Sequence, residues 1–480
     1  MKIGLIAVLT VLVGVMLLKT IGFKSKKYIV SSKQALEVDI RRITGHLSDV
    51  VKFKTVSYSD SSMIDWDEFL KLHKYLEEVY PLVHSNLERE KINDYSLLYR
   101  WPGLEKDKKP ILLTCHMDVV PVEEETEGKW TYPPFNGDVA DGFVWGRGTL
   151  DVKIQMIAIL EAVEQLLRED YEPKRDIYLA FGHDEEVGGK RGATRIAELL
   201  KNRGINFEFV HDEGGCVTDG AIKGVSSSIA VVGICEKGYA DIKLSLEGKG
   251  GHSSMPPQNT ALGKISRAVY RLEQNPFPMK ITKPVRDMLD YIGPEMKGLQ
   301  RMVIGNLWLF APIFKKAFST SPTGNAFLRT TMAATMAKGS DAPNVLPQRA
   351  TAIVNTRILP GETVQDVINH IQKTINDPDI KIDLLHNNEP SKISDVTSES
   401  FKNIERAIYE IFPGTVACPY LVCGGTDARK YEDISDNVYR FSPFHISAKD
   451  LDKMHGTDEC ISIVNLEKAV KFFLSLISKQ

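Results

Sequence analysis

Residues 110–118 read PILLTCHMD, a short apolar run that ends in a histidine and an aspartate. Two later stretches repeat this arrangement, DIYLAFGHDEE at 176–186 and FEFVHDEGG at 207–215. Short apolar runs bounded by polar or glycine-containing segments are typical of buried parallel strands. We therefore expect three strands of one sheet, each with acidic or imidazole side chains at its carboxyl end.

The residues between the first two strands predict a helix. Met156, Leu160, Val163 and Leu167 recur at helical spacing and form one apolar stripe. The alternation of strands and helices between about residues 31 and 232 favours a doubly wound α/β sheet. In such sheets ligands bind beyond the carboxyl ends of the strands, because the connecting loops converge there.

The length of the chain, 480 residues, predicts more than one domain. From about residue 234 the pattern changes, because YADIKLSLEG at 239–248 and ATAIVNTRILPG at 350–361 alternate as half-buried strands do. We expect a smaller α+β domain at 234–352. It would be inserted between two parts of a larger domain, 24–233 and 353–480, behind an N-terminal segment at 1–23.

Several side chains in these stretches suit a two-zinc hydrolase site. Two imidazoles and three carboxylates are suitable Zn²⁺ ligands, and a further carboxylate is left free to act as a base. One candidate, Asp151, opens the helix described above, where the helix dipole favours an anion. The candidates are His116, Asp151, Glu185, Glu186, Asp212 and His455.

The spacing of His116 and Asp118 places both on one side of an extended segment. Asp118 can then accept a hydrogen bond from the ring nitrogen that does not bind metal. This spacing alone is a weak signal, since a surface histidine near an acid is equally common. Glu185 and Glu186 point to opposite sides in extended geometry, so one can bind metal while the other faces a water molecule. An exposed acidic loop is the alternative for this pair.

Seven motifs occur in a fixed order: LLTCHMDVVP, WGRGTLDVK, GHDEEVGG, HDEGG, GHSSMPP, NVLP and GGTDAR. From about residue 110 to the C-terminus the chain resembles the aminoacylase and carboxypeptidase S family of dinuclear zinc hydrolases. It is most similar to the branch of carboxypeptidase S and the N-fatty-acyl-amino-acid hydrolases. The resemblance implies a zinc-exopeptidase α/β domain with an inserted lid, and two Zn²⁺ ions as cofactors.

The resemblance also implies a role for each candidate ligand. Asp151 would bridge both metals. His116 and Asp212 would complete one zinc site, and Glu186 and His455 would complete the other.

Further roles implied by the resemblance concern catalysis and substrate binding. Glu185 would be the general base, and Asp118 would orient His116. His252 in GHSSMPP would stabilise the tetrahedral oxyanion. It would reach the active site when the lid closes, or from the second subunit of a homodimer. The alternative is a solvent-exposed histidine in a turn. Polar residues of the lid and the catalytic domain would bind the substrate carboxylate, namely Asn344, Arg357 and Arg429. For each arginine, a structural ion pair is an equal alternative.

The N-terminal segment is the one long apolar stretch. Ile3 to Leu18 carries no charge, and residues 21–23 extend it beyond Lys19. We expect a single-span membrane anchor, with secretion after signal cleavage as the alternative. The positive-inside rule alone would keep the large domain in the cytoplasm. That rule is weakest for long translocated domains, so it does not decide the orientation of this chain. We expect the large domain on the extracytoplasmic or lumenal side.

Composition excludes some classes of protein. The net charge of -3 and the lack of a basic stripe give no reason to expect nucleic acid as a partner. The six cysteines lack a CxxC pair and are expected to be free thiols, with Cys418 and Cys423 as the one plausible disulfide. The apolar stretch 302–318 is expected to be lid core or a dimer contact, or else an acyl-chain groove or a surface that touches a membrane.

Together these patterns and the family resemblance imply a membrane-anchored metallohydrolase that cleaves an amide bond next to a free carboxylate. The expected substrate is an N-acyl or N-fatty-acyl amino acid, cleaved reversibly. The alternative is a carboxypeptidase or dipeptidase that acts on small peptides. A metallo-aminopeptidase would favour a free amine, and a binding protein without activity would be expected to lose Glu185 or a ligand.

Overall fold

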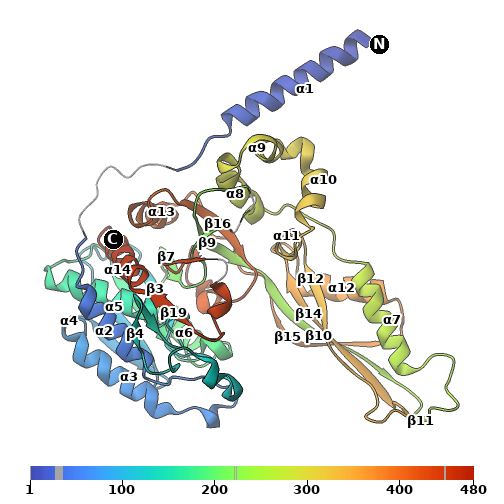
Figure 1. Ribbon diagram of the computed structural model, residues 1–480, viewed down its shortest axis with the longest axis horizontal. Coiled ribbons are helices and arrows are strands. Elements are labelled where there is room, and N and C mark those ends of the chain that lie inside the picture. The colour runs from blue at the N-terminus through green and yellow to red at the C-terminus, as the bar shows by residue number, and fades with distance from the viewer. Residues whose placement is uncertain (1, 28–35, 221, 223, 448–449) are drawn as a thin grey trace.

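The computed structural model describes residues 2–27, 36–220, 222, 224–447 and 450–480. Its chain forms a large α/β unit, an elongated lid and a separate N-terminal helix (Figure 1). The expected combination of a doubly wound catalytic domain, an α+β lid and an apolar N-terminal helix is confirmed.

A ten-stranded sheet forms the centre of the large unit. Its order is β1-β2-β6-β3-β7-β17-β9-β8-β18, and β16 pairs with β9. The three strands expected from the sequence, β3, β6 and β7, are parallel neighbours with every residue buried. The strand bounds are β1 Glu88–Ile92, β2 Ser96–Trp101, β3 Ile111–His116, β6 Ile177–Gly182, β7 Phe209–Asp212, β8 Val217–Asp219, β9 Ile229–Glu236, β16 Val416–Val422, β17 Val438–Arg440 and β18 His445–Ser447.

Helices cover both faces of this sheet, as a doubly wound fold requires. Leu113 of β3 belongs to the same core as helix α5, whereas Leu112 belongs to the core beneath α6, because successive strand residues face opposite sides. Helix α5 is buried along almost its whole surface rather than along one stripe, since α2 and α14 pack against it as well as the sheet. The helices are α2 Ile40–Val51, α3 Trp66–Val79, α4 Pro81–Asn86, α5 Lys153–Arg168, α6 Ala193–Asn202, α13 Glu399–Ile411 and α14 Ile463–Ile477.

A small sheet joins two distant loops of the large unit. Its order is β19-β5-β4, with β4 at Val139–Ala140, β5 at Phe143–Trp145 and β19 at Cys460–Ser462. Cys460 pairs with Trp145, so the segment after β5 and the segment before β19 lie side by side. These two segments contain Asp151 and His455.

The lid is built on an antiparallel sheet with the order β12-β14-β10-β15. The strands are β10 Gly238–Glu247, β12 Thr331–Lys338, β14 Arg349–Ile358 and β15 Lys381–Asn388, with helices α7 Ala261–Gln274 and α12 Val364–Ile375 packed on the sheet. At the far tip β11 Gly251–His252 pairs with β13 Val345–Leu346 (Figure 1). Because β14, α12 and β15 continue this sheet and its core beyond residue 352, we propose that the lid extends to about residue 388.

Four helices inside the lid sequence pack on the large unit instead of the lid sheet. They are α8 Lys283–Ile292, α9 Gly298–Gly305, α10 Leu307–Phe318 and α11 Pro322–Leu328. Val285, Met288 and Leu289 of α8 join the main core, and α8 lies against β16. Thus the apolar stretch 302–318 forms a pair of short helices near the junction of the two units.

The N-terminal segment forms helix α1, Lys2–Gly22. Among the described residues it is the one helix that is long and apolar enough to cross a membrane, over Leu5–Gly22 with a mean hydropathy of 2.4, and none of this window is buried. All six cysteines are free thiols in this structure, and Cys418 and Cys423 are not bridged.

Candidate active site

The carboxyl ends of β6, β3 and β7 bring the expected chemistry to one edge of the sheet. His116 is the last residue of β3, and the pair Glu185–Glu186 lies in the short 3₁₀ helix Glu185–Val187 that follows β6. Glu213 directly follows β7. Since these strands are parallel neighbours, their ends meet at the same place, as the sequence predicted.

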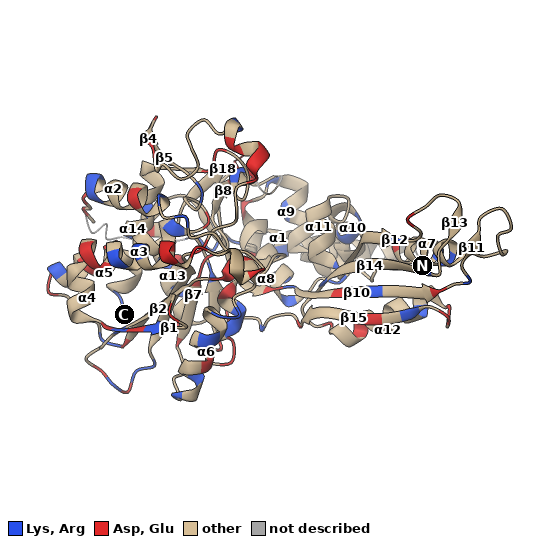
Figure 2. Ribbon diagram, turned by 90° about the horizontal axis from the view of Figure 1, so that it is seen from below, with Lys and Arg blue, Asp and Glu red and all other residues tan. Residues whose placement is uncertain are grey.

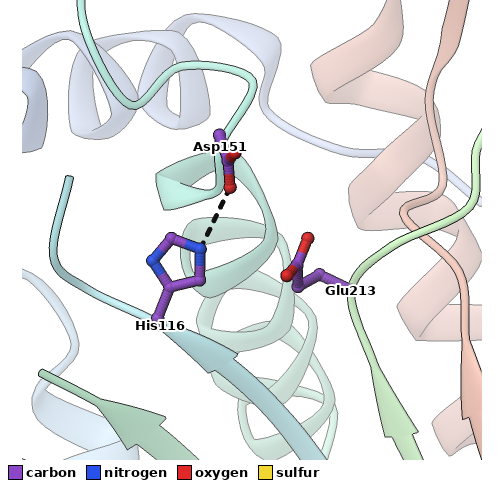
Figure 3. A group of neighbouring side chains, drawn as sticks. All are labelled: His116, Asp151 and Glu213. Atoms are coloured by element: carbon purple, nitrogen blue, oxygen red, sulfur yellow. Dashed lines mark hydrogen bonds and ion pairs between the residues drawn. The ribbon is translucent and has the colours of Figure 1, made fainter. Parts of the chain in front are cut away.

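Asp151 lies between two histidines. Its Oδ1 is 3.0 Å from Nε2 of His116, and its Oδ2 is 2.9 Å from Nε2 of His455. Among the described residues, two groups of side chains could hold a metal ion, and both contain Asp151. One group is His116, Asp151 and Glu213 (Figure 3), and the other is Asp151, Glu186 and His455; within each, the potential ligand atoms all lie within 4.8 Å of one another.

Glu213 was not among the ligands expected from the sequence. Asp212 belongs to neither group of potential ligands among the described residues. It is the last residue of β7, is buried, and accepts a hydrogen bond at Oδ1 from the backbone N–H of Glu213. Burial raises the pKa of Asp212 to about 7. The signal in the sequence was the position of Glu213 just beyond the end of its strand, as Glu185 and Glu186 lie a few residues beyond the end of β6.

The adjacent acids of HDEGG allow a direct test. Because Glu213 and not Asp212 belongs to the group with His116 and Asp151, we expect Glu213→Gln to weaken metal binding about 10–100-fold more than Asp212→Asn does. Zinc retained after dialysis against a graded chelator would measure this for the two variants side by side. Greater metal loss from Asp212→Asn would return the ligand role to Asp212.

Asp118 connects the histidine and the glutamate pair. Nδ1 of His116 is 2.9 Å from the backbone oxygen of Asp118 and 3.5 Å from its carboxylate Oδ1. The carboxylate also accepts hydrogen bonds from the backbone N–H groups of Glu185 at 3.1 Å and Glu186 at 3.2 Å, and from the Ser57 hydroxyl. Burial alone would raise the pKa of Asp118, but these contacts lower it below its ordinary value, so the group is a fixed anion.

The hydrogen bonds of His116 indicate where a cation fits. A carbonyl oxygen only accepts, so Nδ1 donates to Asp118, and the neutral ring then carries its lone pair on Nε2. That lone pair faces the Asp151 carboxylate, an arrangement that needs a proton or a metal between them. At the second group, hydrogen bonds to Asp151 and Glu186 raise the pKa of His455 to about 10. In the same group, Glu186 Oε1 is buried and has no hydrogen-bond partner among the described residues. The donor set therefore fits divalent metal ions such as zinc.

Glu185 lies beside these groups but in neither of them. Burial, together with the neighbouring carboxylates of Asp427, Glu213 and Glu186, raises the pKa of Glu185 well above its ordinary value. A carboxyl group with a raised pKa exchanges a proton near neutral pH more readily than an ordinary glutamate. A carboxyl group of this kind could serve as a general acid and base.

A buried ion pair holds together the two loops that carry Asp151 and His455. Arg147 Nη1 lies 2.7 Å from Glu459 Oε2, and both side chains are nearly inaccessible to solvent. Glu459 Oε1 accepts hydrogen bonds from the backbone of Leu150 and Asp151, while Arg147 Nη2 donates to the carbonyl of His455. Neither residue was expected from the sequence, although Arg147 lies within the quoted WGRGTLDVK motif and Glu459 follows His455 by four residues.

Removing the charge of Glu459 should disturb both loops. We expect Glu459→Gln to lower the free energy of unfolding by about 3–5 kcal/mol, because Arg147 would remain buried without its partner. Denaturant unfolding and zinc titration would measure the loss, and Glu467→Gln on α14, which breaks a surface pair with Lys471, is the control. Equal stability of the two variants would contradict a positioning role for Glu459.

A cavity of about 550 Å³ opens next to these groups. Glu185, Glu186 and His455 line it together with Arg357 from the end of β14 and Arg429 from the 3₁₀ helix Asp427–Tyr431. The cavity thus lies between the sheet edge and the base of the lid. Its two guanidinium groups can accept an anionic ligand.

The two arginines differ in how far they are already engaged. Arg429 Nε is 3.2 Å from the buried carboxylate of Glu236, so part of its role is a structural ion pair. Arg357 packs over the ring of Tyr239 at 4.9 Å, and no carboxylate partner is found for it among the described residues. Arg357 is therefore the better placed of the two to bind a ligand carboxylate.

Comparison with known proteins agrees with this geometry. The model of the family described as Peptidase family M20/M25/M40 matches residues 112–479, which is most of the chain. The chain belongs to the M20 family. It is accordingly a metallohydrolase, and its donor groups are those of a metal-dependent enzyme.

Two curated M20 relatives align over nearly the whole chain. The "Probable carboxypeptidase S-like 2" of Dictyostelium discoideum is 40% identical, over 98% of this chain and 93% of the relative. The "N-fatty-acyl-amino acid synthase/hydrolase PM20D1" of Xenopus tropicalis is 36% identical over the same shares.

Solved structures share the M20 fold at low sequence identity. The M20 metallo-carboxypeptidase Sso-CP2 of Sulfolobus solfataricus superimposes with a TM-score of 0.67 at 16% identity, covering 91% of this chain and 99% of that one. Human carnosine dipeptidase 1 gives a TM-score of 0.61 at 13% identity, with 92% and 97% covered. These structures bear on the fold alone.

His252 and Asn344 lie apart from the other candidates in this M20 chain. Both are at the far tip of the lid, where His252 is in β11 and the backbone N–H of Ser253 donates to the carbonyl of Asn344 (Figure 1). His252 is exposed, and its Nδ1 is 2.8 Å from the Ser254 hydroxyl. The single chain in this conformation does not bring these two residues to the cavity.

Proposed function

We propose that this enzyme hydrolyses the amide bond of N-acyl amino acids, including those with a long acyl chain. The observation that carries the proposal is the pair of metal-binding groups sharing Asp151, set beside Glu185 in a cavity that also contains Arg357. An amide next to a free carboxylate matches this combination of amide-cleaving groups and a cationic side chain. The relative named as an N-fatty-acyl-amino acid synthase/hydrolase supports the long-chain substrate and the reverse reaction, condensation.

We propose two Zn²⁺ ions as the cofactors. His116 and Glu213 would hold one ion and Glu186 and His455 the other, with Asp151 shared. When bound, such ions activate a water molecule and polarise the substrate carbonyl. Three carboxylates offset most of the positive charge of two divalent ions, which reduces the cost of burying them.

The protein side chains would then divide the remaining work. Glu185 takes a proton from the attacking water and passes it to the leaving amine, as its raised pKa allows. Asp118 keeps Glu185 in place through the backbone N–H of Glu185 and holds His116 in one tautomer. Arg357 binds the substrate carboxylate and so orients the scissile amide toward Glu185.

His252 is proposed to stabilise the oxyanion that forms on the carbonyl. From the lid tip it would reach a cavity either by closure of its own lid or from the lid of a second copy of the chain in a homodimer. In both cases the histidine completes the site only when substrate is enclosed. Asn344, next to it, would arrive with it.

The arginine in the cavity can be tested with paired substrates. We expect Arg357→Met to lower kcat/KM for an N-acyl amino acid roughly 10–100-fold, because a charge-assisted hydrogen bond contributes about 1.5–3 kcal/mol. For the same substrate with a terminal carboxamide in place of the carboxylate, kcat/KM should fall far less, because this substrate has no charge for Arg357 to bind. Equal losses for both substrates would show that Arg357 acts only in the structure.

Three substrates distinguish the proposed activity from its main alternative. The full-length enzyme in detergent, with zinc restored, would be given a long-chain N-acyl amino acid, its N-acetyl counterpart and an unblocked dipeptide. Preference for the long chain supports the proposal. Preference for the dipeptide favours the second candidate, a carboxypeptidase or dipeptidase, which the relative named as carboxypeptidase S-like also suggests.

We further propose that α1 is retained as a membrane anchor. Its exposed apolar surface and its length suit a single span. Contacts beyond its end support retention, because Arg301 donates to the carbonyl of Phe23, Lys27 pairs with Glu295, and the Lys26 ammonium lies over the Tyr291 ring. Cleavage that removes α1 would also remove the hydrogen bonds from the buried Asn306 amide to the Met16 carbonyl and the Thr20 hydroxyl.

A further inference from the structure

Helices α9 and α10 expose a cluster of large apolar side chains. Leu299 is 69% exposed, Trp308 51%, Leu309 43% and Ile313 64%. We propose that these two helices, here called the α9–α10 hairpin, lie on the lipid bilayer at the point where α1 enters it. The inference rests on the proposed anchor and adds a second, peripheral membrane contact to it.

The exposed cluster is not a loosely packed region. Ile304 and Phe314, on the opposite sides of the same helices, are buried in the main core. Phe314 stacks on Phe318, which stacks on Phe327 of α11, and Phe327 contacts Tyr420 of β16 edge to face. The hairpin is thus fixed to the catalytic sheet, so its exposed apolar side chains are held outward. Apolar patches held at the surface in this way mark sites of association.

The hairpin is joined directly to α1. Asn306, between α9 and α10, is completely buried, and its amide donates to the Met16 carbonyl at 3.2 Å and the Thr20 hydroxyl at 3.0 Å. Figure 1 shows α9 and α10 below the carboxyl-terminal half of α1. Met16 lies six residues before the end of the apolar window at Gly22, which is roughly 9 Å along a helix. Amphipathic helices on membranes lie at comparable depth, about 5–10 Å into the boundary between headgroups and acyl chains.

The charges around the hairpin suit a lipid surface with anionic headgroups. Residues 296–340 contain no aspartate or glutamate. They contain six basic residues, namely Lys297, Arg301, Lys315, Lys316, Arg329 and Lys338. Several basic positions lie near the hairpin (Figure 2). The Lys19 ammonium of α1 lies 5.3 Å from the Trp308 ring centroid. Tryptophan with nearby lysine is the combination found where protein meets the membrane interface.

This placement would hold the active site close to the membrane. The Lys237 ammonium, which lines the cavity, donates to the carbonyls of Ala326 in α11 and Arg329 just after it. Helix α11 also contacts α10 through the aromatic row. A substrate whose acyl chain is dissolved in the bilayer would therefore meet the cavity at a fixed height and orientation.

Fluorescence of Trp308 in lipid vesicles tests the proposal. The full-length protein would be reconstituted in phosphatidylcholine vesicles, with and without phosphatidylserine, that carry bromine on the acyl chains. Subtracting the spectrum of Trp308→Phe isolates this tryptophan from the other four. We expect bromolipid to remove the Trp308 emission, most completely with phosphatidylserine, and aqueous acrylamide to leave it.

The outcomes separate the hairpin from the anchor. Protein that floats with the vesicles after alkaline washing, yet has Trp308 quenched by acrylamide and not by bromolipid, would keep the anchor and overturn the inference. Protection from both quenchers would also overturn it, in favour of a second copy of the chain covering the hairpin. Failure to float would remove the anchor and this inference together.

A pair of surface variants gives a second measurement. Leu309→Glu combined with Ile313→Glu should lower hydrolysis of a vesicle-bound long-chain N-acyl amino acid several-fold and leave hydrolysis of the soluble N-acetyl substrate unchanged. Leu385→Glu, an equally exposed leucine on β15 of the lid sheet, is the matched control and should change neither. Parallel losses on both substrates would contradict the proposed contact.

Discussion

Replacing Glu185 with glutamine is expected to lower kcat about 10²–10⁴-fold, the range found for positioned general bases. Glutamine keeps the size of the side chain, and the backbone N–H that donates to Asp118 remains. It cannot take up a proton from water, so the loss should fall on the chemical step. Zinc content and KM should stay near those of the parent enzyme, because Glu185 belongs to neither metal-binding group.

Steady-state kinetics with metal analysis on the same samples checks this result. The control is Glu198→Gln, which removes one carboxylate from the exposed pair with Arg195 on α6 and should leave kcat unaltered. A fall of less than tenfold in kcat would remove Glu185 from the role of base. A fall accompanied by loss of zinc would instead make it a ligand.

Replacing Asp151 with asparagine is expected to abolish measurable activity and to release metal from both sites. Its two carboxylate oxygens each face a different histidine, at 3.0 Å for His116 and 2.9 Å for His455. An amide offers one neutral oxygen in place of two charged ones, so at least one of the two groups loses its shared ligand. The remaining carboxylates also no longer balance two divalent ions.

Metal content after dialysis, measured by mass spectrometry, separates this variant from the others. We expect Glu186→Gln to weaken one site and Asp151→Asn to weaken both, because only Asp151 belongs to both groups. Asp170→Asn, in the exposed turn just after α5, is the charge-matched control. Retention of two tightly bound ions by Asp151→Asn would contradict its shared position.

Local patterns in the sequence were enough to predict the sheet edge. The apolar runs that end at His116, Gly182 and Asp212 are adjacent parallel strands in the structure. Short buried apolar runs identify such strands, and the carboxyl ends of neighbouring parallel strands lie at the same edge of the sheet. The helix after Asp151 and the alternating strands of the lid were predicted for the same reason. The extent of the lid was harder to predict, since α12 and β15 join it through contacts with β10, more than a hundred residues earlier.

Contacts between distant segments decided the finer chemistry. In HDEGG the choice between Asp212 and Glu213 depends on where β7 ends, and in the structure the side chain next to His116 is that of Glu213, just beyond the strand. The buried pair of Arg147 and Glu459 joins segments about three hundred residues apart, which no local pattern reveals. The lid-tip position of His252 likewise depends on the length and direction of β10.

The sequence by itself determined the family, the strands and helices, and most of the residues at the sheet edge, because hydrophobic period and motif spacing are local properties. Only the tertiary structure decided that Glu213 lies in the first metal-binding group, that Arg357 is freer than Arg429, and that the α9–α10 hairpin lies against α1. Each of these depends on contacts between side chains that are far apart in the sequence. Packing and burial over the whole molecule determine these contacts, and the neighbouring residues in the sequence do not.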